Sequence, residues 1–83
     1  MNNTIRKLLA RLGSLSTPIE TLADDADLYA AGLSSFASVQ LMLGLEEAFD
    51  VEFPDHLLNR KSFASVAAIE GALTQILEQR KVA

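Results

Sequence analysis

Cysteine is absent from this 83-residue sequence, and histidine occurs once, as His56. Without cysteine the chain has no disulfide, no thiolate metal ligand and no thiol nucleophile of its own. No apolar run approaches the length of a membrane span, and no signal-peptide pattern opens the chain. We therefore expect a soluble cytoplasmic protein that folds as one small domain over residues 1–83.

Positive charge is missing from the middle of the chain. Between Leu12 and Asn59 there are nine acidic residues and no lysine or arginine. The acidic residues are Glu20, Asp24, Asp25, Asp27, Glu46, Glu47, Asp50, Glu52 and Asp55. Such a segment repels nucleic acid and anionic lipid, and attracts basic protein surfaces. We expect protein partners and neither nucleic acid nor membrane, although these charges would also keep a small domain soluble.

Groups that perform catalysis are scarce. His56 stands beside Asp55, and we interpret it as a surface residue rather than a general base. Asp24, Asp25 and Asp27 lack the regular spacing and closing glutamate of a calcium loop, so they are interpreted as a solvated acidic turn. The four glycines are scattered and form no phosphate-binding loop. The sequence therefore predicts that the chain is not an enzyme and holds no metal.

Apolar residues recur at helical spacing in three segments, and no alternating strand pattern is present. The first helix should end at Gly13, and a long connection over residues 14–33 should follow. The second helix should span residues 35–49, and a short third one residues 55–59. A fourth helix should begin with Ser62 as its cap. The expected fold is all-α: a small bundle of three main helices and one short helix, with a long first loop.

The long loop and the fourth helix each carry a further expectation about packing. The loop contains four scattered apolar residues that we expect to anchor it to the core, because an unanchored loop of this length is unusual. They are Ile19, Leu22, Leu28 and Leu33. Within the fourth helix, Gly71 should mark a place where two helices pack closely.

The second predicted helix has apolar residues on two opposite faces. One face is an ordinary core stripe, with all members except the serine expected to be buried: Ser38, Leu41, Met42, Leu45 and Phe49. The opposite face comprises Phe36, Val39, Gln40, Leu43 and Glu47. A surface helix normally carries polar residues there. Those residues either pack under the long loop or form a stripe to which a partner binds, and their proximity to Ser35 favours binding.

The start of this helix contains two serines with different expected roles. Gly32 permits a sharp turn, and Ser34 is a good N-cap. Ser35 then falls in the first turn, where its hydroxyl is exposed near unpaired backbone N–H groups. An anion attached to that hydroxyl would be stabilised by the same groups. Because no base lies nearby in sequence, Ser35 is either a second capping residue or a point of attachment rather than a nucleophile.

The motifs around Ser35 resemble those of acyl carrier proteins and peptidyl carrier domains over nearly the whole chain. They are Asp27-Leu28, Gly32-Leu33-Ser34-Ser35-Phe36, Val39-Gln40-Leu41, Leu45-Glu46-Glu47-Ala48-Phe49-Asp50 and Val51-Glu52-Phe53-Pro54. The attachment motif of that family, Asp-Ser-Leu, aligns with Ser34-Ser35-Phe36. The resemblance implies that Ser35 carries 4′-phosphopantetheine, installed from coenzyme A by a phosphopantetheinyl transferase. The thiol of this arm would hold a cargo as a thioester.

Two departures from the family pattern bear on the cargo. Ser34 replaces the usual aspartate, and Ala37 and Gln40 stand where fatty-acid carriers usually have acidic residues. The pattern is most similar to standalone bacterial aminoacyl carrier proteins. These receive a small amino acid, such as glycine or alanine, from amino acid:carrier protein ligases that resemble the catalytic core of seryl-tRNA synthetases.

We expect a monomer, and we expect such a ligase to contact it around four residues on the second apolar face of the helix at residues 35–49. The sequence does not identify the downstream acceptor. The four residues are Phe36, Val39, Gln40 and Leu43. Two alternatives remain open. The same carrier could hold a fatty-acyl or polyketide chain. In the other alternative the chain is a helical adaptor without a prosthetic group, in which Ser34 and Ser35 are only caps.

Overall fold

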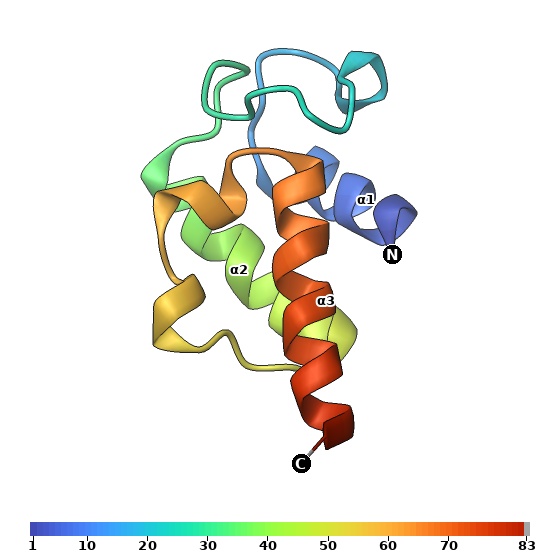
Figure 1. The fold of residues 1–83 in the computed structure, drawn as a ribbon. Coiled ribbons are helices and arrows are strands. Elements are labelled where there is room, and N and C mark those ends of the chain that lie inside the picture. Colours follow the sequence, from blue (N-terminus) through green and yellow to red (C-terminus); the bar gives the residue numbers. More distant parts are fainter. Residues whose placement is uncertain (83) are drawn as a thin grey trace.

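The computed structural model describes residues 1–82, and the regular secondary structure in that range is helical, without a β-strand. Its α-helices are α1 (Asn2–Leu12), α2 (Ser35–Phe49) and α3 (Val66–Val82), shown in Figure 1. Short 3₁₀ turns lie between them: η1 (Ile19–Thr21), η2 (Asp55–Leu57) and η3 (Arg60–Phe63). The predicted all-α bundle with a long first loop is confirmed. Residue 83, the last of the predicted domain, lies outside the described residues.

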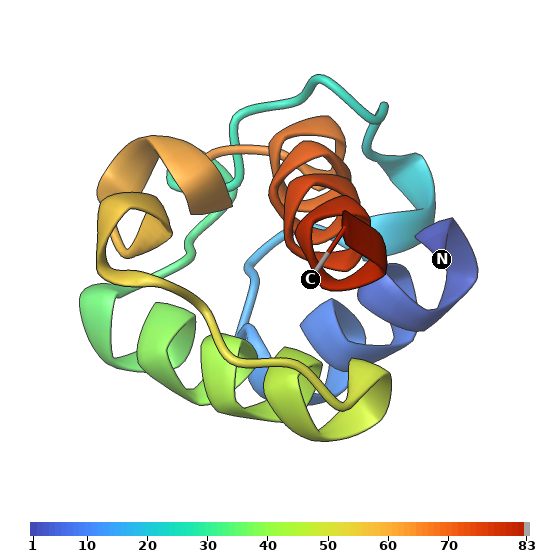
Figure 2. The same cartoon turned by 60° about the horizontal axis from the view of Figure 1, so that its bottom comes forward.

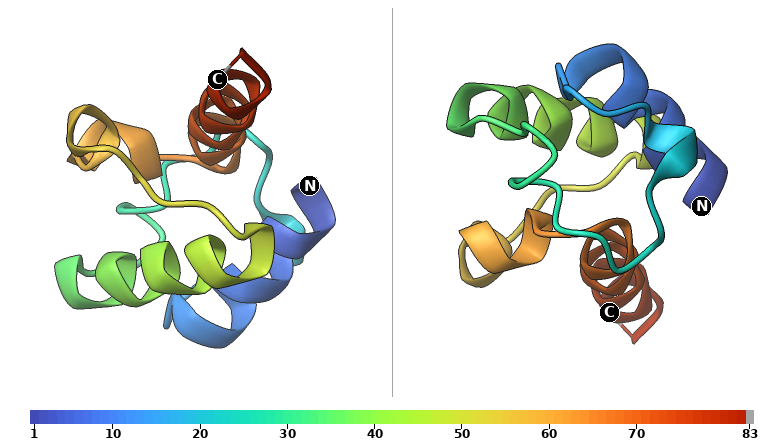
Figure 3. Two further views of the ribbon diagram at one scale, coloured as in Figure 1. Left: turned by 90° about the horizontal axis from the view of Figure 1, so that it is seen from below. Right: turned by 90° about the horizontal axis from the view of Figure 1, so that it is seen from above.

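The elements form two layers around one core. Figures 2 and 3 show α1 and α2 on one side, and α3 with the η2–η3 segment on the other. The connection from α1 to α2 crosses one end of the bundle (Figure 1). The core between the layers contains Ile5, Leu8, Leu9, Leu41, Leu45, Phe63, Val66, Ile69, Leu73 and Ile76. Met42 and Phe49, expected in the core, are only partly buried and pack against it.

The long loop is anchored by apolar and polar contacts. Ile19, Leu28 and Leu33 are buried, and Leu22 packs against the core while partly exposed, which confirms the predicted anchoring. The Arg6 guanidinium on α1 donates to the carbonyls of Ile19 and Leu22, over 2.9 and 2.8 Å. The Ile19 carbonyl also accepts the Leu22 N–H over 3.1 Å, so Arg6 ties the η1 turn of the loop to α1.

The start of α3 differs from the prediction. Ser62 is not its cap: it is buried within η3, where its backbone N–H donates to the Asn59 side chain. The cap is Ser65, whose hydroxyl oxygen accepts a hydrogen bond from the Ala68 N–H over 3.0 Å. The chain completes η3 first because that turn places Phe63 in the core. The predicted short helix over residues 55–59 is correspondingly reduced to η2.

The glycine that allows close helix packing is also not the predicted one. A Cβ added at Gly71 would meet no atom within 4 Å, so the prediction for that residue was wrong. At Gly44 on α2, a Cβ would lie 2.8 Å from Leu12 Cδ1 and 3.5 Å from Leu8 Cδ2, both on α1. Gly44 therefore permits the approach of α1 to α2. None of the helices within residues 1–82 has the length and apolar character needed to cross a membrane.

Candidate functional site

The start of α2 separates the roles of its two serines. The Ser34 hydroxyl oxygen accepts a hydrogen bond from the Ala37 N–H over 3.0 Å, and its backbone is extended, as in an ordinary N-cap. The Ser34 carbonyl accepts from the Ser38 N–H over 2.9 Å. The predicted cap is therefore confirmed, and the first helical residue, Ser35, is not needed for capping.

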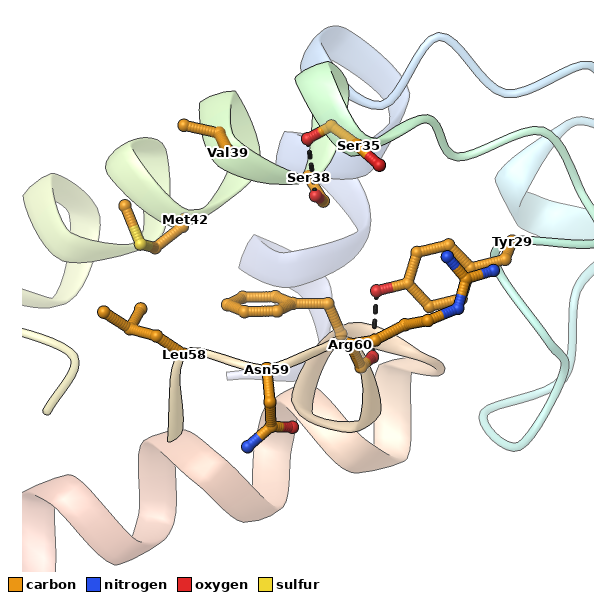
Figure 4. Close-up of a pocket in the computed structure, with 9 residues that line it drawn as sticks. Tyr29, Ser35, Ser38, Val39, Met42, Leu58, Asn59 and Arg60 are labelled. Atoms are coloured by element: carbon orange, nitrogen blue, oxygen red, sulfur yellow. Dashed lines mark hydrogen bonds between the residues drawn. The ribbon is translucent and has the colours of Figure 1, made fainter. Parts of the chain in front are cut away.

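Ser35 is exposed at the amino end of α2. Its carbonyl accepts a hydrogen bond from the Ser38 hydroxyl over 2.7 Å, drawn as a dashed line in Figure 4. Its own hydroxyl has no hydrogen bond to the rest of residues 1–82. The oxygen is thus available for modification, at the end of a helix whose dipole stabilises negative charge.

The conformation of the loop before Ser35 is set by a side-chain hydrogen bond of Asp27 and by the backbone of Gly32. Asp27 Oδ1 accepts the Tyr29 N–H over 2.9 Å and so initiates a turn. Gly32 has φ of 111°, and a Cβ there would lie 3.0 Å from the Ser16 nitrogen. Only glycine suits this left-handed position in close contact with another backbone segment. Leu33 is buried directly afterwards, which fixes where α2 begins.

A groove of about 270 Å³ opens beside Ser35, between α2 and the η2–η3 segment. Its lining residues are Tyr29, Ser35, Ser38, Val39, Met42, Leu58, Asn59, Arg60 and Phe63. Figure 4 shows Tyr29 and Arg60 at one end, and Val39, Met42 and Leu58 toward the other. One end of the groove is therefore polar and cationic, and the other is apolar.

Tyr29 and Arg60 were not predicted as site residues. The Arg60 Cζ lies 3.8 Å from the centroid of the Tyr29 ring, and the Tyr29 hydroxyl donates to the Arg60 carbonyl over 2.8 Å. Burial, with a smaller contribution from Asp27, raises the pKa of Tyr29, whereas the Arg60 charge opposes the rise. The hydroxyl thus keeps its proton and this hydrogen bond at neutral pH. The two residues are 31 positions apart, so no local pattern indicates their contact.

The outward face of α2 is exposed, as the docking interpretation requires. The exposed fractions of Phe36, Val39 and Leu43 are 73%, 53% and 55%, and Gln40 is also exposed. These side chains do not pack under the long loop, so that alternative is excluded. We call Phe36, Val39, Gln40 and Leu43 the outer stripe of α2.

The other residues that the sequence singles out are His56 and the acidic turn. His56 is exposed on η2, and no cluster of three or more potential metal ligands occurs among residues 1–82. In the acidic turn, Asp24 is engaged in a contact that stabilises the fold: it forms an ion pair with Arg6 and accepts a hydrogen bond from the Asn2 amide over 3.0 Å. These contacts, the one with Arg6 first, hold the pKa of Asp24 below its ordinary value.

Comparison with known proteins places this geometry in a family. The family described as "Phosphopantetheine attachment site" matches residues 3–73. An "Aminoacyl carrier protein" of Agrobacterium fabrum is 69% identical over the full length of both chains. These two similarities span the loop, α2 and the groove.

Solved structures are similar as well. One is a crystal structure of an engineered Bradyrhizobium japonicum glycine:[carrier protein] ligase complexed with carrier protein from Agrobacterium tumefaciens and AMP. The matched chain is 73% identical with a TM-score of 0.87, over 89% of this chain and 99% of that one. Another contains the Bradyrhizobium japonicum ligase complexed with glycylated carrier protein. Its matched chain is 30% identical with a TM-score of 0.74, over 86% of this chain and 95% of that one.

The family match covers most of the chain, and the curated relative covers all of it. Proteins of this family hold a covalently attached 4′-phosphopantetheine and act as carriers on which other enzymes work. The chain therefore belongs to the phosphopantetheine-attachment family, as a carrier protein and not an enzyme.

Proposed function

We propose that Ser35 is the residue that bears the 4′-phosphopantetheine arm. The observation that carries this proposal is the division between the two serines: the Ser34 hydroxyl is used as the helix cap, whereas the Ser35 hydroxyl is exposed and unbonded. A phosphopantetheinyl transferase would join the Ser35 oxygen to the phosphate of the arm. The pyrophosphate bond of coenzyme A would break, adenosine 3′,5′-bisphosphate would leave, and the serine hydroxyl would lose its proton. The helix start then stabilises the resulting phosphodiester charge.

The residues around Ser35 fit this group. The phosphodiester would lie between the amino end of α2 and the Arg60 side of the groove, where positive charge favours an anion. The arm, when attached, supplies a thiol that holds a cargo as a thioester. Because the chain has no cysteine, no thiol of the polypeptide competes with it.

The proposed cargo is an aminoacyl group of small size, glycine or alanine, with glycine better supported. The relative that matches the full length is named an aminoacyl carrier protein, and one similar structure contains a glycylated carrier protein. The proposed loading enzyme is an amino acid:carrier protein ligase of the seryl-tRNA-synthetase-like kind. Support for a ligase comes from the complexes of carrier proteins with glycine:[carrier protein] ligase among the similar structures.

The outer stripe of α2 is the proposed docking surface for the ligase. Phe36 directly follows Ser35, and Val39 and Leu43 continue along the same face of the helix. Exposed apolar side chains at this spacing suit an apolar surface on a partner. We further propose that the carrier works in the cytoplasm as a monomer, one domain over residues 1–83.

Family membership excludes the alternative of an adaptor without a prosthetic group. A fatty-acyl or polyketide cargo is the competing hypothesis for the carrier itself. Incubation of the modified protein with candidate ligases and labelled glycine, alanine and fatty acids distinguishes the two. We expect retention of labelled glycine, and retention of a fatty-acyl label alone would contradict the proposal.

Intact-mass spectrometry tests the attachment residue. Wild-type protein treated with coenzyme A and a phosphopantetheinyl transferase should gain the mass of one arm, and Ser35→Ala should gain none. Ser34→Ala is the matched control: it loses the cap, at a cost of about 1 kcal/mol in stability, but should still be modified. A mass gain in Ser35→Ala would show that another residue bears the arm.

A further inference from the structure

The cationic end of the groove is held in place by two contacts. The Tyr29 ring stacks against the Arg60 guanidinium at 3.8 Å, and the Tyr29 hydroxyl bonds to the Arg60 carbonyl at 2.8 Å. Stacking on an aromatic ring orients a guanidinium without using its N–H donors. Within residues 1–82, no carboxylate or carbonyl accepts a hydrogen bond from this guanidinium. Its donors are therefore oriented and available to bind another group.

The position of Arg60 indicates what that group is. It is the single basic residue among those lining the groove, and Ser35 lines the same groove. The preceding segment, from Leu12 to Asn59, has no lysine or arginine. A guanidinium binds phosphate oxygens through charge-assisted hydrogen bonds, and its planar geometry matches two of them at once.

We propose that Arg60, stacked on Tyr29, binds the phosphodiester of the arm, and that the apolar end of the groove receives the adjoining pantetheine chain. This inference rests on the proposed attachment at Ser35. The covalent bond confines the phosphodiester to the vicinity of Ser35, so Arg60 binds it as an intramolecular ligand. Val39, Met42 and Leu58 supply apolar contacts to the chain beyond it (Figure 4).

The size and polarity of the groove favour binding of the arm and not of its aminoacyl cargo. A volume of about 270 Å³ lies just below the usual range for small-molecule sites, roughly 300–1,000 Å³, and suits part of an arm. An aminoacyl thioester at the far end of the arm has a free amine that is protonated at neutral pH, and the apolar end of the groove offers no partner for this charge. The groove thus holds the first part of the arm and leaves an aminoacyl group in solvent.

NMR on isotopically labelled protein, with and without the arm, tests this inference. We expect the Arg60 Nε–Hε signal to shift when the arm is attached. Nuclear Overhauser contacts should join the pantetheine methyl protons to the side chains of Val39, Met42 or Leu58. In Arg60→Gln the phosphorus signal of the phosphodiester should move and these contacts should be lost. Lys61→Gln removes the neighbouring charge outside the groove and is the matched control. It should have the wild-type phosphorus signal and the wild-type contacts.

The result that overturns the inference is a wild-type protein that bears the arm but has an unshifted Arg60 signal and no contacts to the groove. Intact mass on the same samples separates this from failure of the proposed function, which would appear as no mass gain or as a gain in Ser35→Ala. Arg60→Lys keeps the charge without the planar guanidinium, so its phosphorus signal should lie between those of the wild type and Arg60→Gln. If Arg60→Gln fails to fold, the wild-type comparison with and without the arm still decides.

Discussion

The two faces of α2 are built from similar residues and have opposite roles. Leu41 and Leu45 are fully buried in the core, whereas Val39 and Leu43, on the same helix, are more than half exposed. Hydrophobicity therefore does not distinguish them. The inner face stabilises the fold, and the outer face begins beside Ser35 and is available to a partner. Substitutions of leucines on the two faces of α2 therefore measure stability and recognition separately.

The largest expected effect comes from truncating the inner face. Leu45→Ala should lower the free energy of unfolding by about 2–5 kcal/mol, because it leaves a cavity in a well-packed core. A domain of this size has only about 5 kcal/mol to lose. Urea unfolding followed by circular dichroism measures the change. Leu43→Ala is the matched control and should stay within about 0.5 kcal/mol of wild type. Equal losses in the two variants would contradict the division between the faces.

The next effect concerns the two helix glycines. Gly71→Ala should raise the free energy of unfolding by up to about 1 kcal/mol, because alanine favours helix and the added Cβ meets no neighbour. Gly44→Ala should gain less, since its Cβ would lie 2.8 Å from Leu12 Cδ1 and that side chain must move. Thermal unfolding of both variants measures the difference. A larger gain for Gly44→Ala would show that α1 and α2 are not in close contact there.

Charge on the outer face should affect recognition more than stability. Leu43→Asp should remain within about 0.5 kcal/mol of wild-type stability, because Leu43 is exposed. Loading of the modified carrier by its ligase should weaken, since a charge then replaces an apolar contact. Initial rates of aminoacylation measure loading, and Glu47→Gln on the same face is a control that changes charge outside the outer stripe. Severe thermal destabilisation by Leu43→Asp would place Leu43 in the core instead.

The smallest expected effect is the pH dependence due to Asp24. Its contacts with Arg6, and then with Asn2, lower its pKa in the folded state, so the unfolded state binds more protons as the pH falls. The stabilisation is therefore present above the ordinary carboxyl pKa of about 4 and is lost as the pH falls through the lower pKa of the folded state. Urea midpoints at neutral and acidic pH should differ less in Asp24→Asn than in wild type. An unchanged difference would contradict this role for the ion pair.

Much of the site could be predicted because its chemistry is local. The start of α2 follows from Ser34, whose hydroxyl oxygen accepts a hydrogen bond from the backbone N–H three residues later, and from the turn at Gly32 just before it. The outer stripe of α2 follows from helical periodicity. The start of α3 was less predictable, because both Ser62 and Ser65 are suitable caps. Burial of Phe63 decided between them.

Long-range contacts could not be predicted in the same way. Gly44 and Gly71 look alike in sequence, and only the approach of α1 gives Gly44 its function. Tyr29 and Arg60 have no shared motif, because their contact depends on how the loop crosses the η2–η3 segment. The residues near Ser35 encode, through short-range bonds and periodicity, an exposed hydroxyl at a helix start with an apolar stripe beside it. The groove beside Ser35 exists only after packing brings residues 31 positions apart together, because its walls come from separate segments.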